Sequence, residues 1–375
     1  MKIKYFDHAA TTRVSDEVLD EMYPYFSNYF FNASSIYKGA KNVKEEIEHA
    51  REKIANAIGA QRDEIYFTSG GTESDNLGIK GIAFANMKYG RHIITSKIEH
   101  PAVLNTCRTL ERFGFRVSYV DVDSNGMIRL DDLRRTIRKD TILISVMAAN
   151  NEIGTIQPLE EIGKIAKRNN IIFHTDAVQG IGNIKIDVKT MNIDSLSMSA
   201  HKFYGPKGVG ALYVKKTVGF VRQNDGGHQE NDKRSGTLNS AGIIGLGKAI
   251  ESASINLESN AQKLIGLREY FLKKISQNFN NYRINGDRDL RLPGNVNISF
   301  KGYNGNYLVE KLSERGIYVS SMSACSSGFF NPSHVLLAIG LGEEEAKSAL
   351  RITFGIDNSI DEIDELIDSL KEIVR

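Results

Sequence analysis

The sequence predicts an α/β protein with a largely parallel β-sheet. Short runs rich in β-branched and aromatic residues alternate with longer segments of helical periodicity as far as Val214. The short runs are continuously apolar, which suits strands that are buried on both faces. Glycines gather between the segments, where turns belong. This alternation of strands and helices indicates βαβ units and therefore parallel strands.

Seven runs are expected to form this sheet, with helices flanking it. The strands are predicted over residues 65–68, 92–95, 117–120, 141–146, 171–174, 195–198 and 210–214. Helices are predicted between them, over residues 76–87, 102–113 and 162–169.

The chain changes character after about residue 250. A long polar helix is predicted over residues 250–279 and a strand over residues 295–300. The last helix is expected to begin at Ser359, because Glu362 completes a capping box. Its apolar face is expected to hold Ile360, Ile363, Ile367 and Leu370. At about 150 residues per domain, the 375 residues suggest two domains, so this region predicts a second, smaller α+β domain.

Composition excludes several classes of function. The chain has 48 Lys and Arg against 46 Asp and Glu, a net charge of +2, so no bulk charge favours nucleic acid or acidic lipid. Its two cysteines, Cys107 and Cys325, cannot alone form a disulfide framework or a structural zinc site. No apolar run reaches the ~20 residues that span a bilayer, and the N-terminus lacks a signal-peptide pattern. The expected location is the cytoplasm, with both thiols reduced.

Two glycine-rich stretches are candidates for an anion site. In residues 68–76 a strand turns into a helix through Gly70 and Gly71. Free N–H groups at such a helix start bind anions, although a plain strand–helix turn explains the pattern equally well. Residues 242–249 approach a nucleotide P-loop, but Ala249 stands where a hydroxyl would bind Mg²⁺, so a packed helix is favoured. No His-Glu-x-x-His or Cys-x-x-Cys pattern occurs, and no metal site is expected.

Two further residues follow buried strands. Asp176 is either a helix N-cap or a carboxylate at the ligand-binding edge of the sheet. Lys202, beside His201, is either a solvated charge or an amine of lowered pKa that attacks an aldehyde. A phosphate cradle, an acid and a lysine at strand ends of one sheet are the groups that pyridoxal phosphate requires.

Specific motifs now identify a resemblance that runs from about Tyr5 to the C-terminal helix. They are Asp7-His8-Ala9-Ala10-Thr11-Thr12, residues 68–76, Glu99-His100, Asn150-Asn151-Glu152-Ile153-Gly154, residues 176–179 and 199–208, Arg234-Ser235-Gly236-Thr237 and Ser323-Ala324-Cys325-Ser326-Ser327. With these motifs the chain resembles the cysteine desulfurases of the NifS/IscS type, which are class V aminotransferases among the fold-type I pyridoxal-phosphate enzymes. The resemblance implies a large cofactor-binding domain at residues 15–255. It also implies a small domain, at residues 1–14 and 256–375, that carries the loop of Cys325.

The same resemblance implies how pyridoxal phosphate is bound. Lys202 would hold the cofactor covalently and later move protons at the substrate Cα. Asp176 would pair with the pyridinium nitrogen, and His100 would stack on the ring and help to transfer protons. The remaining cofactor contacts would come from Asn151 and Gln179 near the ring, from Gly71, Thr72, Ser199 and His201 at the phosphate, and from Thr237 of the second subunit of a homodimer.

Substrate binding and sulfur transfer are also implied by the resemblance. Arg351 would clamp the substrate carboxylate, assisted by Asn32. The family commonly has a proline where this chain has Ala33, so the loop of Asn32 is expected to be looser. Cys325, among small polar residues typical of an exposed loop, would take the substrate sulfur as a persulfide and leave alanine. Cys107, in a helical pattern, is expected to be structural.

The sequence therefore predicts an L-cysteine desulfurase that supplies sulfur for iron–sulfur cluster assembly or tRNA thiolation. Its partners would be a scaffold protein or another sulfur-acceptor protein. One alternative is a related fold-type I enzyme, such as a selenocysteine lyase or an aminotransferase. Another is a non-catalytic docking protein that kept the fold, although the intact set of Lys202, His100, Asp176 and Cys325 argues against it.

Overall fold

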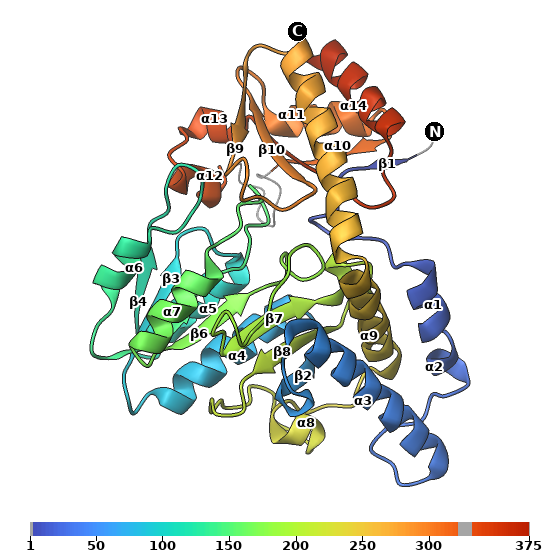
Figure 1. Ribbon diagram of the computed structural model, residues 1–375, viewed down its shortest axis with the longest axis vertical. Helices are drawn as coiled ribbons and strands as arrows, with labels where there is room; N and C mark the ends of the chain where they lie inside the picture. The colour runs from blue at the N-terminus through green and yellow to red at the C-terminus, as the bar shows by residue number, and fades with distance from the viewer. Residues whose placement is uncertain (1–2, 322–331, 375) are drawn as a thin grey trace.

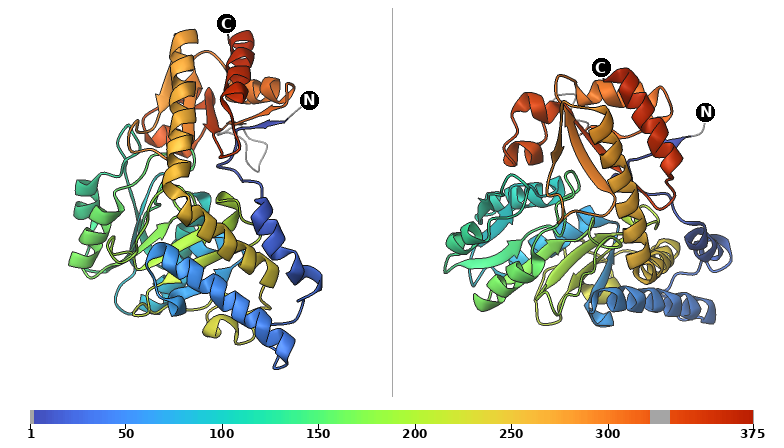
Figure 2. Two further views of the ribbon diagram at one scale, coloured as in Figure 1. Left: turned by 45° about the vertical axis from the view of Figure 1, so that its right-hand side comes forward. Right: turned by 45° about the horizontal axis from the view of Figure 1, so that its top comes forward.

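The protein consists of a large lower part and a smaller upper part, each built around its own sheet (Figure 1). The computed structural model describes residues 3–321 and 332–374. A long helix, α10 (Leu257–Asn278), runs from the lower part to the far end of the upper part in both views of Figure 2.

The large sheet has seven strands in the order β2-β8-β7-β6-β5-β3-β4. They are β2 (Ile65–Thr68), β3 (His92–Ser96), β4 (Arg116–Val120), β5 (Thr141–Ser145), β6 (Ile172–Asp176), β7 (Ser195–Ser199) and β8 (Gly210–Val214). Each agrees with a predicted strand to within about two residues. Only β8 runs antiparallel to its neighbours, β2 and β7. The prediction of a mostly parallel seven-stranded sheet is confirmed.

Helices cover both faces of this sheet, as predicted. They are α1 (Asp16–Met22), α2 (Pro24–Ser27), α3 (Lys38–Ile58), α4 (Gly71–Asn86), α5 (Pro101–Arg112), α6 (Leu130–Thr136), α7 (Leu159–Arg168), α8 (Gln229–Asp232) and α9 (Ser240–Ile255), with 3-10 turns at Arg62–Glu64 and Ala200–Lys202. Successive strand residues point to opposite faces. Leu212 packs with α4 and α5, whereas Ala211 and Tyr213 pack in the core that includes α3, α7 and α9.

Two predicted helices differ from the observed ones. α4 begins at Gly71 rather than at Asn76, because the glycine turn itself opens the helix. The single helix predicted over residues 250–279 is wrong, since Asn256 ends α9 and begins α10. Residues 242–249 lie within α9, where a Cβ on Gly247 would stand 2.6 Å from the Cβ of Ala50 in α3. This close approach confirms the interpretation of that stretch as a packed helix.

The upper part holds a four-stranded antiparallel sheet in the order β12-β13-β10-β9. Its elements are β9 (Tyr282–Asn285), β10 (Asn295–Phe300), α11 (Gly305–Ser313), β11 (Ile317–Tyr318), β12 (Ser320–Ser321), α12 (His334–Ala338), α13 (Glu343–Lys347), β13 (Ala349–Thr353) and α14 (Ile360–Ile373). The predicted strand over residues 295–300 is confirmed as β10. Ser359 caps α14 as predicted, accepting a hydrogen bond from the Glu362 N–H. Ile360, however, is 50% exposed and lies outside the buried face of that helix.

The first residues of the chain join the upper part. β1 (Lys4–Tyr5) pairs in parallel with β11. Phe6 is fully buried in the upper core, together with residues of α10, β10, β13 and α14. We propose the division into residues 15–255 and residues 1–14 with 256–375, which this separate core supports.

Candidate active site

Two neighbouring strands of the large sheet end at the candidate site. Asp176 is the last residue of β6 and Ser199 is the last residue of β7, and the two strands run parallel. Lys202 closes the 3-10 turn that directly follows β7. Open α/β sheets bind ligands at the carboxyl ends of their strands. The fold thus brings the predicted acid and the predicted lysine to one edge.

The start of α4 offers an anion cradle beside this edge. Gly71 and Thr72 form its first turn, whose backbone N–H groups have no partner within the helix. A Cβ on Gly71 would stand 2.6 Å from Val178 Cγ2, so a larger residue does not fit there. The Ser199 hydroxyl lies 3.6 Å from the position of a Cβ on Gly70. A phosphate can therefore approach both the helix start and this hydroxyl.

His201 lies between Ser199 and Lys202 in the chain. Its Nδ1 is 3.1 Å from the Thr11 hydroxyl, which belongs to the N-terminal segment. Burial lowers the pKa of His201 to about 4, and the Lys202 charge adds to this effect. The imidazole is therefore neutral at pH 7 and acts as a hydrogen-bonding group rather than as a cation.

Asp176 and His100 face each other in a buried cluster. One oxygen of Asp176, one oxygen of Asp75 and a ring nitrogen of His100 lie within 4.8 Å of one another. The Val178 N–H donates to Asp176 Oδ1 at 2.9 Å. His100 caps α5, where its Nδ1 accepts from the Ala102 N–H at 3.1 Å. Since burial lowers the pKa of His100, the neutral ring carries its proton on Nε2.

These three groups also have the spacing of a cation site. No metal site is expected from the sequence, and Lys202 beside the cluster favours the binding of a cofactor ring by these groups. A buried carboxylate at a strand end suits the protonated nitrogen of a bound ring.

The amine of Lys202 is held by the N-terminal segment. Its Nζ donates to the carbonyl oxygens of Ala9 and Ala10, at 2.6 and 2.8 Å. Burial and the nearby charge of Arg351 together lower its pKa to about 8. The amide of Gln179 donates to the same Ala9 carbonyl at 2.9 Å. A lysine with this pKa is partly neutral at physiological pH and can attack an aldehyde.

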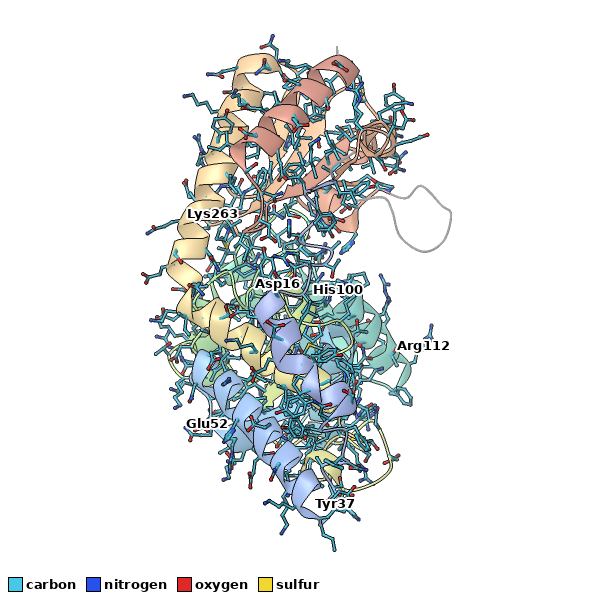
Figure 3. The ribbon with its side chains drawn as sticks, turned by 90° about the vertical axis from the view of Figure 1, so that its right-hand side faces the viewer. Asp16, Tyr37, Glu52, His100, Arg112 and Lys263 are labelled. Carbon is cyan, nitrogen blue, oxygen red and sulfur yellow. The ribbon has the colours of Figure 1, made fainter. Side chains whose placement is uncertain are left out.

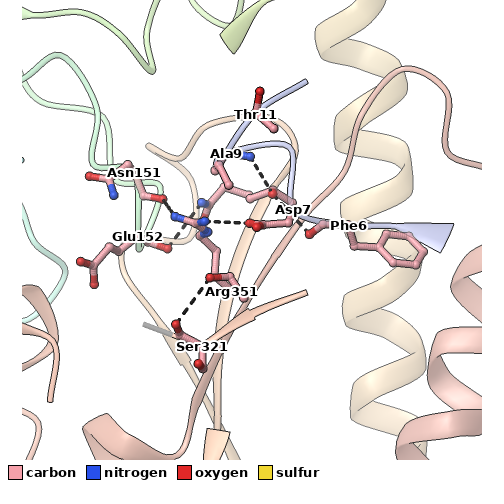
Figure 4. A network of polar contacts seen from close by, with 12 residues as sticks. Phe6, Asp7, Ala9, Thr11, Asn151, Glu152, Ser321 and Arg351 are labelled. Carbon is pink, nitrogen blue, oxygen red and sulfur yellow. Dashed lines mark hydrogen bonds and ion pairs between the residues drawn. The ribbon is translucent and has the colours of Figure 1, made fainter. Parts of the chain in front are cut away.

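Arg351 enters the site from β13 of the upper part. Its guanidinium donates to the Asp7 carboxylate at 2.7 Å and to the Asn151 carbonyl at 3.0 Å (Figure 4). The side chain is buried, and its Nε has no hydrogen-bond partner among residues 3–321 and 332–374. Arg351 therefore joins both parts of the protein while part of its hydrogen-bonding capacity remains free. A guanidinium placed in this way suits a carboxylate ligand.

Two predicted residues lie apart from this cluster. Asn32 is exposed in the loop between α2 and α3, and its Oδ1 accepts from the Ser34 N–H at 2.9 Å. That loop leads to Tyr37, which lies at the lower end of the molecule, well below His100 (Figure 3). Ala33 is buried against the core, so this residue of the loop is anchored. Within the part of the chain that the structure describes, no hydrogen bond or ion pair joins Asn32 to the cluster.

Thr237 is likewise exposed, in the loop between α8 and α9. Three residues before it, Arg234 pairs with Glu73 of α4 at 2.7 Å. The Glu73 carboxylate also accepts the Ser69 N–H at 2.7 Å. This ion pair anchors the loop of Thr237 to the first turn of α4.

The structure describes one of the two cysteines. Cys325 lies outside the described residues. Cys107 is fully buried in α5, and burial raises the pKa of its thiol to about 12. Its expected structural role is consistent with this placement.

Sequence reasoning gave no role to two acids of the site, Asp75 and Asp7. Both occur within the motifs that carried the resemblance. Asp75 is the fifth residue of α4, so the early start of that helix was the missing information. Asp7 meets Arg351 across 344 residues of sequence, a contact that no local pattern reveals.

Together these groups fit pyridoxal phosphate. The helix start and Ser199 offer donors for a phosphate, Asp176 offers a buried carboxylate for a ring nitrogen, and Lys202 offers a reactive amine for an aldehyde. The tight approach at Gly71 and the lowered pKa of Lys202 are features that a solvent-facing turn would not need.

Comparison with known proteins decides the family. The model of the family described as aminotransferase class-V matches residues 4–366. The chain belongs to this family. Class-V aminotransferases are pyridoxal-phosphate enzymes, and this chain is one of them.

Members of the class-V family with similar sequences are cysteine desulfurases. The relative named cysteine desulfurase IscS from Clostridium botulinum is 50% identical over 373 residues, covering 99% of this chain and 94% of its own. The protein of the same name from Methanosarcina thermophila is 51% identical over 374 residues, covering 100% and 92%. These matches extend over both parts of the fold.

Solved structures of class-V relatives have the same architecture. A NifS-like protein superposes with a TM-score of 0.94 at 39% identity, covering 99% of each chain. A structure described as SspA in complex with cysteine superposes with a TM-score of 0.84 at 41% identity, covering 94% of this chain and 99% of that one. In residues 3–321 and 332–374 of the present chain, no helix has both the length and the apolar character needed to cross a membrane.

Proposed function

We propose that this enzyme takes sulfur from L-cysteine and releases L-alanine, with Cys325 as the sulfur carrier. The observation that carries this proposal is the convergence of Lys202, Asp176 and Arg351 between the two parts of the fold. An amine for the cofactor, an acid for its ring and a guanidinium for a substrate carboxylate together suit a free amino acid.

The position of Cys325 in the chain supports its part in this reaction. Ser320 of β12 pairs with Arg351 across the sheet, and β12 ends at Ser321. Cys325 follows four residues later, and four extended residues span at most about 14 Å. In the sequence, Cys325 thus follows closely after the strand that pairs with the strand of Arg351.

Each described group has a proposed task. Gly71, Thr72, Ser199, His201 and Gln179 bind and orient the cofactor. Arg351 holds the substrate carboxylate, and Asp176 keeps a negative charge opposite the ring nitrogen. When bound, pyridoxal phosphate withdraws electrons from the substrate Cα and so weakens the bond between Cβ and sulfur. The Lys202 amine takes a proton from the substrate Cα, and the His100 ring holds a proton on its Nε2.

Sulfur transfer then balances with no outside oxidant. The Cys325 thiolate attacks the substrate sulfur, so a sulfur–sulfur bond forms as the carbon–sulfur bond breaks. The electron pair of the broken bond stays with the carbon part of the substrate, which takes up protons and leaves as alanine. The thiolate is the reactive form of a cysteine, and the product is a persulfide on Cys325.

The remaining features of the proposal concern the setting of the enzyme. We propose a homodimer in which Thr237 reaches the phosphate of the other subunit and Asn32 assists substrate binding there. Both residues are exposed and lie apart from the cluster of Lys202, Asp176 and His100 in their own subunit. We propose that the persulfide passes to a scaffold or another sulfur-acceptor protein in the cytoplasm. A reducing compartment keeps such a thiol available.

The test is incubation of the purified enzyme with L-cysteine and a reductant, with alanine and sulfide measured together. Equal amounts of both products are expected. Cys325→Ala should keep the bound cofactor and lose both products, whereas Cys107→Ala is the matched control that should retain them. Undiminished sulfide production by Cys325→Ala would refute the role of Cys325.

The alternatives predict other outcomes of this test. An aminotransferase would form a keto acid from cysteine and no persulfide on Cys325. A selenocysteine lyase would act on selenocysteine and leave cysteine unchanged. A docking protein would be isolated without pyridoxal phosphate and could not be loaded with it.

A further inference from the structure

A second buried carboxyl lies beside Asp176, and the reaction described above gives it no task. Asp75, in the second turn of α4, is 1% exposed. One of its oxygens lies within 4.8 Å of Asp176 and of His100. Its Oδ1 has no hydrogen-bond partner in the described part of the chain. The two carboxyls therefore form a close pair below the proposed cofactor ring.

The packing of α4 on the sheet forces this approach. Gly78, three residues after Asp75, faces the sheet so closely that a Cβ there would stand 3.2 Å from His174 Cδ2 and 3.1 Å from Leu212 Cδ1. The same contact places the Asp75 carboxylate 3.9 Å from His174 Nε2. Asp75 is thus fixed by the fold rather than by a flexible loop.

Two buried carboxyls this close cannot both carry a charge, so one of them keeps a proton. Burial raises the pKa of Asp176 too, but its neighbours oppose this effect, since it accepts the Val178 N–H and lies near His100 and Lys202. Burial raises the pKa of Asp75 well above its usual range, and the charge of Asp176 raises it further. The proton therefore resides on Asp75.

On the Asp75 side, the neighbour that the structure describes is a neutral histidine rather than a cation. The ring nitrogens of His174 lie 2.9 and 3.1 Å from the hydroxyls of Ser145 and Ser197. Burial lowers the pKa of His174 to about 3, so the ring is neutral. A neutral Asp75 between a neutral histidine and a charged Asp176 can donate its proton to the Asp176 carboxylate, which is a strong acceptor.

We propose that Asp75 is a positioning residue whose neutral carboxyl donates a hydrogen bond to Asp176, holding that carboxylate charged and correctly aimed at the cofactor ring nitrogen. The proposal rests on the proposed function, because it needs pyridoxal phosphate above Asp176. A hydrogen bond to a charged group contributes about 1.5–3 kcal/mol, equivalent to about a 10- to 100-fold effect.

The test compares Asp75→Asn, which keeps the shape and a donor, with Asp75→Leu, which keeps the size and removes the donor. Asp75→Asn is expected to match the wild type in cofactor affinity, in the visible spectrum of the bound cofactor and in kcat. Asp75→Leu is expected to bind the cofactor about tenfold more weakly and to lower kcat at least about tenfold. Its KM for cysteine should stay unchanged, since Arg351 is untouched.

Three results would overturn the proposal. Asp75→Asn as impaired as Asp75→Leu would show that a charged Asp75 is needed. Asp75→Leu with the spectrum and kcat of the wild type would show that no positioning occurs. The third readout needs only the wild type and Asp75→Asn, so it holds even if Asp75→Leu does not fold. Burial also raises the pKa of Glu99, to about 8, so that carboxyl contributes a neutral band of its own. The infrared difference spectrum of the wild type minus Asp75→Asn should therefore contain one further carbonyl band of a neutral carboxyl, and a difference spectrum without that band refutes the idea.

If the proposed function is wrong, the experimental results differ from those that would refute the role of Asp75. An enzyme that binds pyridoxal phosphate but forms no alanine would refute the desulfurase reaction. The infrared band, the cofactor affinity and the visible spectrum would still decide the role of Asp75 in that case.

Discussion

Arg351 and Asp7 form an ion pair of 2.7 Å that joins β13 to the N-terminal segment. That segment also supplies the Ala9 and Ala10 carbonyls that hold the Lys202 amine. The proposed substrate clamp and the proposed cofactor lysine are thus connected through residues 7–10. Movement of this segment would alter both groups at once.

Arg351→Lys should weaken the binding of cysteine. Lysine keeps the positive charge but lacks the planar fork that holds a carboxylate with two hydrogen bonds. We expect KM for cysteine to rise about 10- to 100-fold, which corresponds to the loss of one charged hydrogen bond. The visible spectrum of the bound cofactor should be unchanged. Arg315→Lys, at an ion pair with Glu372 elsewhere in the upper part, is the control, and equal KM values for the two variants would contradict the clamp.

Cofactor capture by the apo protein should depend on pH. The attacking species is the neutral Lys202 amine, and its pKa is lowered from 10.5 to about 8 by burial. The rate of capture should therefore rise with pH up to about 8 and level off above it. Stopped-flow absorbance after mixing apo protein with pyridoxal phosphate measures this rate. A rate that keeps rising to pH 10 would mean that the amine has an ordinary pKa.

Lys202→Ala should bind the cofactor without a covalent link, so borohydride would no longer fix it to the chain. Lys207→Ala, five residues later and exposed, is the matched control. Cofactor that borohydride still fixes to Lys202→Ala would refute the assignment of this lysine.

Local sequence patterns sufficed for the sheet but not for the long-range contacts of the site. Continuous apolar runs such as residues 141–146 identify a buried strand because each residue contributes to the same signal. The break at Asn256 escaped prediction, since helical periodicity continues on both sides of it and the chain bends there to enter the upper part. Lys202 and Asp176 were predictable because both follow buried strands.

The partners of those residues were not predictable in the same way. To predict where Asp75 lies, one must know the true start of α4. To predict the pairing of Asp7 with Arg351, one must know the tertiary fold. The exposed positions of Asn32 and Thr237, apart from the cluster of Lys202, were not predictable from the sequence either, because they depend on where their loops lie in the fold.

Glu230→Gln should destabilise the large part of the protein. Glu230 is buried and binds both terminal nitrogens of Arg51, at 2.7 and 2.8 Å, as well as the Phe67 N–H at 2.7 Å. Its backbone has a positive φ of 48°, and the next two residues share this strained conformation. Breaking a buried pair leaves an uncompensated charge and costs about 3–5 kcal/mol.

Chemical denaturation with urea measures this loss. Glu314→Gln removes an exposed ion pair with Lys311 and should leave the unfolding midpoint unchanged. A Glu230→Gln midpoint equal to that of Glu314→Gln would mean that the buried pair does not stabilise the strained turn.

Mixing two impaired variants should restore activity if each site is built from two subunits. Lys202→Ala lacks the amine, and Thr237→Ala lacks the hydroxyl proposed to reach the other subunit's phosphate. In a mixed dimer, one site has both defects and the other site has neither. Random exchange makes half of the dimers mixed, so about a quarter of all sites should be intact in a two-fold symmetric dimer.

Alanine release before and after subunit exchange measures this recovery, and native mass spectrometry counts the mixed dimers. Lys202→Ala mixed with Arg351→Lys is the matched control. Both of those residues belong to one cluster within a single chain, so each site of their mixed dimer would carry one defect and no site would be intact. No recovery is expected in this control. An equal lack of recovery for Thr237→Ala, despite abundant mixed dimers, would place Thr237 in its own subunit's site and contradict the shared arrangement.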